Sequence, residues 1–205
     1  RRSRISPRRT NRRSTLHLSG GTGFGTNNGF NNSAIVVNAG NSTIKSNNAT
    51  FIALPAISGS GNLIIASDDD NLRVDLAGAA NSFSGSVTFR PEGELSTGMT
   101  VRIAGAANDL PNAAVTLENG AGIANRSGSS FVVGIELGAL SGDSTTNLTP
   151  FSGGGSSPGT NWIIGNRNMN TEFAGVIQNG GGGGAISHVT KVGTGTLILS
   201  GANTY

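Results

Sequence analysis

Residues 191–205 read Lys-Val-Gly-Thr-Gly-Thr-Leu-Ile-Leu-Ser-Gly-Ala-Asn-Thr-Tyr. Leucine recurs at every second residue in the middle of this stretch, at 197 and 199, and successive side chains of a β-strand point to opposite faces of a sheet. The alternation predicts a short strand in which Leu197 and Leu199 point inward, while Ile198 and its polar neighbours point outward. Glycine on both sides of the strand permits the sharp turns that bound it.

Parts of this stretch recur elsewhere in the chain. Residues 59–65 (Gly-Ser-Gly-Asn-Leu-Ile-Ile) parallel 193–199, residues 76–83 parallel 199–205 with one extra Ala, and residues 15–20 (Thr-Leu-His-Leu-Ser-Gly) parallel 196–201. The copies are degenerate and irregularly spaced, unlike the strands of a sandwich. Recurring units indicate stacking, in which each unit buries its apolar face against its neighbours.

Short extended segments fill the rest of the chain, and no helix is predicted because Gly or Asn interrupts nearly every window. The predicted strands cover residues 34–38, 50–54, 62–66, 72–76, 86–89, 100–104, 114–117, 131–137, 161–164, 173–177 and 196–199. Their spacing of about 10–15 residues fits a sandwich, a barrel or a solenoid, and the internal repeats favour the solenoid. We therefore expect an all-β fold, a right-handed parallel β-helix that is a fragment of a longer one.

Four small or polar residue types dominate the composition. The 205 residues include 33 Gly, 23 Asn, 24 Ser and 19 Thr. Gly and Asn adopt positive φ readily and suit a fold with many tight turns. Charged residues make up only 12 % of the chain, whereas disordered chains usually carry high charge and few β-branched residues. The composition therefore indicates short strands joined by many turns.

Basic residues are concentrated at the N-terminus. Seven arginines lie within residues 1–13, and from Ser14 onward the chain has 7 basic and 11 acidic residues. A nucleic-acid-binding domain would gather its cations on one face, so we expect no specific nucleic-acid partner. We divide the chain into a disordered basic arm or artefact at 1–14 and a β-helix at 15–205. Binding of the arm to nucleic acid or to an anionic surface is the alternative.

The chain has no Cys, which excludes a disulfide scaffold and Cys-ligated zinc. No stretch approaches 18 apolar residues, so we expect no transmembrane segment in it. The N-terminus is charged but lacks the apolar region of a signal peptide. If the protein is exported, we expect its signal to lie upstream or to have been removed.

Residues 191–205 resemble the autotransporter-associated β-strand repeat, also called the passenger-associated transport repeat. That motif runs roughly Lys-x-Gly-x-Gly-x-Leu-x-Leu-x-Gly-x-Asn-x-Tyr, and the chain stops at its Tyr, inside the unit. A looser resemblance covers about residues 15–205. The earlier copy departs from the motif because it lacks the Lys and has Phe83 in place of the Tyr.

The resemblance implies the passenger domain of an autotransporter from a Gram-negative or related bacterium. Such a protein is secreted or lies at the cell surface, attached to the outer membrane through a further domain downstream. The repeats of this family are structural, so the resemblance implies a structural or interaction module, a β-helical stalk such as that of an adhesin, and not an enzyme. The expected partners are a host or environmental surface, a glycan or a second copy of the chain.

Asp68-Asp69-Asp70 is the only acidic cluster in the sequence. Parallel β-helices host enzymes that use carboxylates, sometimes with Ca²⁺, so the alternative function is a β-helical polysaccharide lyase or hydrolase acting through this cluster. Successive strand residues point to opposite faces, which separates the three carboxylates, and no basic partner accompanies them. We expect a solvated turn and assign no catalytic, cofactor-binding or metal-binding residue.

The remaining candidates favour structural roles. His17 and His188 lie in strand-like runs without a Ser or Asp signature, and we expect them to be solvent-exposed. The glycine runs at 153–159 and 180–184 lack the Lys-Ser/Thr of a phosphate loop and predict flexible loops. Aromatic residues are too sparse for a sugar-binding platform, and most are expected to pack inside the coils. Those assigned to the interior are Phe83, Phe89, Phe131 and Phe173.

Overall fold

The computed structural model describes residues 13–19, 34–47, 51–68, 72–78, 82–92, 98–103, 109–125, 132–150, 159–180 and 184–205, with only the backbone described at 13–19 and 47. Every regular element in these segments is a strand. The strands are β1 (Arg13–Ser19), β2 (Ile35–Val37), β3 (Asn41–Asn47), β4 (Phe51–Leu54), β5 (Ile57–Gly59), β6 (Asn62–Ser67), β7 (Arg73–Leu76), β8 (Ser86–Pro91), β9 (Thr100–Ile103), β10 (Leu110–Leu117), β11 (Gly122–Asn125), β12 (Val133–Gly142), β13 (Asn147–Thr149), β14 (Gly159–Ile164), β15 (Thr171–Phe173), β16 (Val176–Ile177), β17 (Ile186–Lys191) and β18 (Leu197–Leu199).

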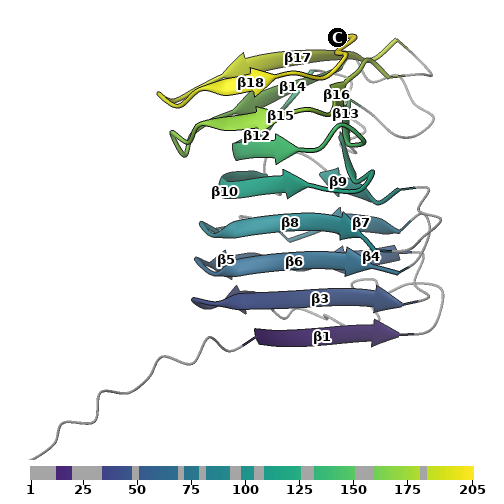
Figure 1. Ribbon diagram of the computed structural model, residues 1–205, viewed down its shortest axis with the longest axis vertical. Helices are drawn as coiled ribbons and strands as arrows, with labels where there is room; N and C mark the ends of the chain where they lie inside the picture. The colour runs from purple at the N-terminus through teal and green to yellow at the C-terminus, as the bar shows by residue number, and fades with distance from the viewer. Residues whose placement is uncertain are drawn as a thin grey trace, which may run out of the picture.

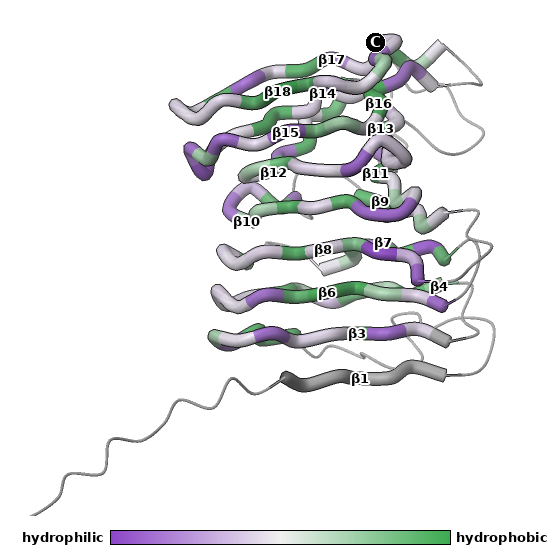
Figure 2. The backbone as a smooth tube through the Cα atoms, in the orientation of Figure 1, coloured by the Kyte–Doolittle hydropathy of each residue, from purple (hydrophilic) through white to green (hydrophobic). Residues whose placement is uncertain are grey.

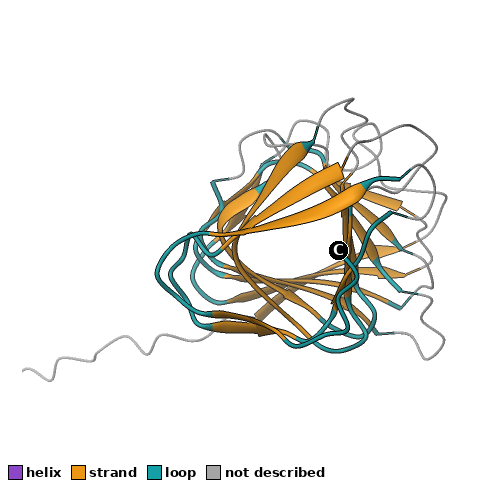
Figure 3. Ribbon diagram, turned by 90° about the horizontal axis from the view of Figure 1, so that it is seen from above, coloured by secondary structure: helices purple, strands orange, loops and turns teal. Residues whose placement is uncertain are grey.

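These strands form three parallel sheets. The first has the order β1-β3-β6-β8-β10-β12-β14-β17, and β15 joins it by pairing with β12 and β18. The second has the order β16-β13-β11-β9-β7-β4, and the third pairs β2 with β5. Successive coils of the chain thus lie on top of one another, from β1 to β17 and β18 (Figure 1). Seen along the stacking axis, the strands lie on the sides of the coil and loops form its corners (Figure 3).

The coil is right-handed. In Figure 1 the chain climbs from β1 at the bottom to β18 at the top, while the strands facing the viewer run to the right. This is the hand that crossover connections between parallel strands adopt almost without exception. The structure therefore confirms the predicted all-β fold and the parallel β-helix.

Coil length varies along the axis. Residues paired on neighbouring coils of the first sheet include Asn41 with Asn62, Asn62 with Ser86, Ser86 with Ala114 and Ala114 with Ala139. These steps are 21, 24, 28 and 25 residues, and the step from β15 to β18 is 26 residues. Connections of different length absorb the variation, which explains why the internal copies in the sequence are irregularly spaced.

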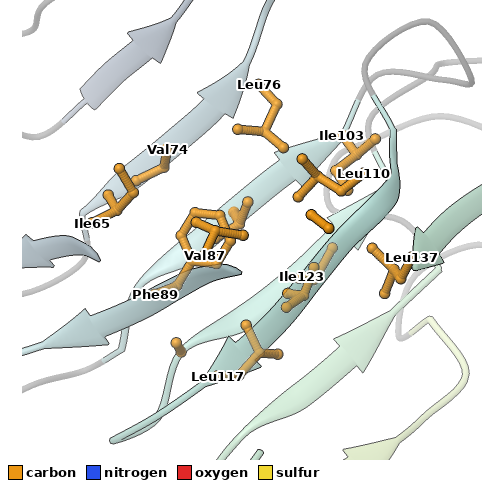
Figure 4. Close-up of a cluster of buried hydrophobic side chains, with 14 of the residues drawn as sticks. Ile65, Val74, Leu76, Val87, Phe89, Ile103, Leu110, Leu117, Ile123 and Leu137 are labelled. Carbon is orange, nitrogen blue, oxygen red and sulfur yellow. The ribbon is translucent and has the colours of Figure 1, made fainter. Parts of the chain in front are cut away.

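The core consists of columns of inward side chains. In the first sheet, one column stacks Ile44, Ile65, Phe89 and Leu117 on successive coils. The last three are fully buried, and Ile44 is 5 % exposed. Figure 4 shows side chains from both large sheets meeting between them. Burial of each side chain of this size contributes roughly 1.5–3 kcal/mol to the free energy of unfolding. Each added coil therefore increases the stability of the β-helix.

The predicted alternation in the motif strand is confirmed. Leu197 and Leu199 are half-buried and pack against the core, whereas Ile198 is 52 % exposed. Figure 2 shows apolar and polar residues alternating along the strands of successive coils. Three of the four phenylalanines assigned to the interior, Phe83, Phe89 and Phe173, are fully buried. Phe131 lies outside the described residues.

Most predicted strands are present within one to four residues of their expected ends. The segment predicted at 173–177 is divided, because the chain turns at Ala174-Gly175 between β15 and β16. Six strands lie outside the predicted segments, namely β1, β3, β5, β11, β13 and β17, although His17 in β1 and His188 in β17 were placed in strand-like runs. β1 begins at Arg13, inside the segment expected to be a basic arm, and residues 1–12 lie outside the described residues.

Candidate functional site

Five charged side chains form a column where the strands of the first sheet end. We call Lys45, Asp68, Arg90, Glu92 and Glu118 the charged column. Lys45 Nζ lies 2.8 Å from Asp68 Oδ1 and 2.8 Å from Glu92 Oε2. Arg90 pairs with Glu92 at 2.6 Å and with Glu118 at 3.7 Å. The column joins four successive coils through side chains of alternating charge.

Two groups of the charged column, Lys45 and Glu92, are held in their charged forms. Hydrogen bonds from Lys45 to Asp68 and Glu92 raise the pKa of the Lys45 ammonium. The hydrogen bond from Lys45 is also the main cause that lowers the pKa of the Glu92 carboxyl. A nucleophilic or basic lysine requires the opposite change, a lowered pKa. Lys45 is therefore a structural cation, and the column is a ladder of ion pairs.

Of the acidic cluster in the sequence, the described residues include Asp68. Asp68 follows β6 and pairs with Lys45, while Asp69 and Asp70 lie outside the described residues. The pairing gives Asp68 the basic partner that the sequence did not reveal. Within the described segments, no group of three or more His, Asp or Glu side chains could hold a metal ion.

Asp143 organises the turn that follows β12. Its Oδ1 accepts hydrogen bonds from the backbone N–H (2.8 Å) and the hydroxyl of Thr145, and its Oδ2 accepts one from the N–H of Asn119 at 2.7 Å. Burial alone would raise the pKa of this carboxyl, but these hydrogen bonds outweigh it and the pKa is lowered. Asn119 has a positive φ of 55°, so the carboxylate ties together two tight turns on neighbouring coils.

Asp109 is an ionisable residue that the sequence did not single out. It precedes β10 and is only 3 % exposed. Burial raises the pKa of its carboxyl to about 6. A raised carboxyl pKa is one mark of an acid catalyst, but a residue this deeply buried cannot reach a polysaccharide on the surface. No motif surrounds Asp109 in the sequence, so only the structure reveals it.

The histidines and the glycine runs form no site in the described residues. His188 lies in β17 and is exposed, as predicted. His17 lies in β1, where the structure describes only the backbone. Most of the run at 153–159 and the centre of the run at 180–184 also lie outside them.

Residues of the motif at 191–205 make contacts that hold the coils together. Lys191 Nζ donates to the carbonyl oxygens of Val192 at 2.5 Å and Gly193 at 3.1 Å. A Cβ added to Gly201 would overlap the carbonyl oxygen of Gly175 on the coil below. Asn203 Oδ1 accepts a hydrogen bond from the N–H of Ile177, also on that coil, at 2.8 Å. The Lys caps a turn, while the Gly and the Asn fasten one coil to the next.

Comparison with known proteins gives no identification. No family model, no curated protein and no solved structure matches the chain. In the part of the chain that the structure describes, no helix could cross a membrane. The class that the fold defines is the parallel β-helix, and any finer assignment depends on the residues themselves.

Proposed function

We propose that the chain is a structural and interaction module of a secreted or surface-exposed bacterial protein of the autotransporter-passenger kind. In this proposal it is a β-helical stalk that holds loops away from the cell, as in an adhesin, and it carries out no catalysis. Its partners are a host or environmental surface, a glycan or another copy. Attachment to the outer membrane is through a further domain of the whole protein.

The observation that carries this proposal is the role of the motif in coil stacking. Gly201 fits against the Gly175 carbonyl, and Asn203 completes the hydrogen bonding of Ile177. Each repeat of a motif that stacks one coil on the next adds length to a solenoid, because each unit contacts only its neighbours. Length and rigidity are the properties that a stalk needs.

The paired state of Asp68 also supports the proposal over the polysaccharide-degrading alternative. A general acid or base must be free to take and release a proton, whereas Asp68 is held by Lys45 at 2.8 Å. The proposal therefore predicts that an Asp68→Asn variant behaves like the original protein towards polysaccharides. Turnover of pectin-like polysaccharides that disappears in Asp68→Asn would contradict the proposal.

Limited protease treatment of intact bacteria tests the location. We expect peptides from residues 15–205 of the full-length protein to be released from unbroken cells, while peptides of a cytoplasmic protein are not released. The role is tested by an in-frame deletion of residues 15–205, which should reduce adhesion to a glycan-coated surface. Peptides released only after lysis would contradict the location, and unchanged adhesion would contradict the interaction role.

A further inference from the structure

Asp109 is a buried carboxylate with few hydrogen bonds. Its Oδ2 accepts a hydrogen bond from the N–H of Glu136 at 2.9 Å, and its Oδ1 has no hydrogen-bond partner among the residues that the structure describes. A carboxylate can accept about four hydrogen bonds, and burial of a charge without partners is costly. The site therefore suits the neutral carboxyl better than the ionised one.

The surrounding charge does not compensate for the burial. Among the described residues, the charged group that acts on Asp109 is Glu136 in β12. Burial is the main cause that raises the pKa of Asp109, the hydrogen bond from Glu136 N–H opposes the rise, and the Glu136 charge adds to it. A second negative charge thus disfavours ionisation of the first.

Asp109 also lies where the stacking is interrupted. β10 pairs with β12 at Leu110, and the register then shifts before pairing resumes at Ala114. A Cβ on Gly138 would lie 2.7 Å from the carbonyl oxygens of both Pro111 and Ala113, so β12 packs closely on this bulge. The bulge leaves a short length of β10 without regular pairing to the coil above.

We propose that Asp109 makes this step between coils a proton-sensitive joint. With the carboxyl protonated, the start of β10 stays closed against β12. With the carboxyl ionised, this segment opens more often, because opening brings the charge into water.

The direction of the pH effect follows from the two states. The carboxyl ionises at about 6 when the joint is closed and near its ordinary value of 3.8 when the joint is open. A group whose pKa is raised in the closed state contributes its full stability below the lower value and loses it as the pH rises through the upper value. The joint is thus tighter at pH 4 than at pH 7.

Hydrogen exchange of the amides in residues 110–117 measures the opening. After correction for intrinsic exchange, we expect protection in the original protein to fall about fiftyfold from pH 4 to pH 7, since a pKa difference of one is a factor of ten and the carboxyl of the open joint is already partly ionised at pH 4. In Asp109→Asn, the amide oxygen still accepts from Glu136 N–H, and protection should not change with pH. Asp143→Asn is the matched control, and it should keep the fall at β10.

Two results would overturn the proposal: no fall in the original protein, or the same fall in Asp109→Asn. If Asp109→Asn does not fold, the original protein alone decides the matter. An NMR titration of its side-chain carboxyl carbons should then show Asp109 with a midpoint near 6. A midpoint at or below about 4, the ordinary range for Asp, would refute the joint.

Discussion

Gly85 illustrates how closely two coils approach at a single residue. A Cβ there would overlap the carbonyl oxygen of Gly61 and lie 2.6 Å from the Phe83 ring. Gly61 and Phe83 are both buried, so neither neighbour has room to move. The same relation holds between Gly201 and Gly175. Glycine at these positions is thus a requirement of stacking.

We predict that Gly85→Ala lowers the free energy of unfolding by about 1–3 kcal/mol, the usual effect of overpacking. Gly134→Ala is the matched control, because an added Cβ would meet only the flexible end of Ile163, at 3.2 Å. It should be neutral or stabilise by a few tenths of a kcal/mol to about 1 kcal/mol. Urea unfolding followed by the fluorescence of Trp162, the single and fully buried tryptophan, measures both. Equal effects of the two substitutions would contradict this account of Gly85.

The turn between β14 and β15 supports the coils below it. Arg167 in this turn donates from Nη1 to the carbonyl oxygens of Gly85 and Asn112, both at 2.9 Å, and of Ser84. Its own N–H donates to the Gly138 carbonyl oxygen at 2.8 Å. One side chain therefore connects several coils beside the bulge of β10, where ladder hydrogen bonds are interrupted.

Replacing Arg167 by Met should lower the free energy of unfolding by about 1–2 kcal/mol, because carbonyl groups lose a charged donor. Arg90→Met in the charged column is the comparison. Exposed ion pairs contribute about 0–1 kcal/mol and are screened by salt, so its effect should be smaller and should shrink in 1 M NaCl. Thermal unfolding of both variants at low and high salt tests the difference. A larger effect for Arg90→Met would be the contrary result.

The sequence predicts some of the strands and misses others, and both outcomes have physical reasons. β6 and β8 were predicted because their inward Leu, Ile, Val and Phe residues alternate with outward ones. β3 has only one large apolar residue, Ile44, and becomes a strand because β1 and β6 pair with its two edges. The Lys45–Asp68 pair and the burial of Asp109 depend on residues brought together by coils of unequal length. No local sequence pattern indicates that these residues lie close together.

For the molecule as a whole, parallel stacking is the property from which the other conclusions follow. Stacked coils place Thr88 of β8 beside Thr116 of β10, and Thr116 beside Ser141 of β12. These side chains point outward, and the hydroxyl oxygens of Thr116 and Ser141 are 3.0 Å apart. The proposed stalk, the charged column and the joint at Asp109 all depend on this register being correct.

Engineered disulfides measure the register directly, because the chain has no Cys of its own. Adjacent strands lie about 4.8 Å apart, within the Cα separation of about 4.4–6.8 Å that a disulfide needs, whereas strands two coils apart are about 10 Å apart. We predict that Thr88→Cys with Thr116→Cys forms an intramolecular disulfide on mild oxidation. Thr88→Cys with Ser141→Cys should form no intramolecular disulfide under the same conditions. A disulfide in the second pair, or none in the first, would contradict the β-helix described above.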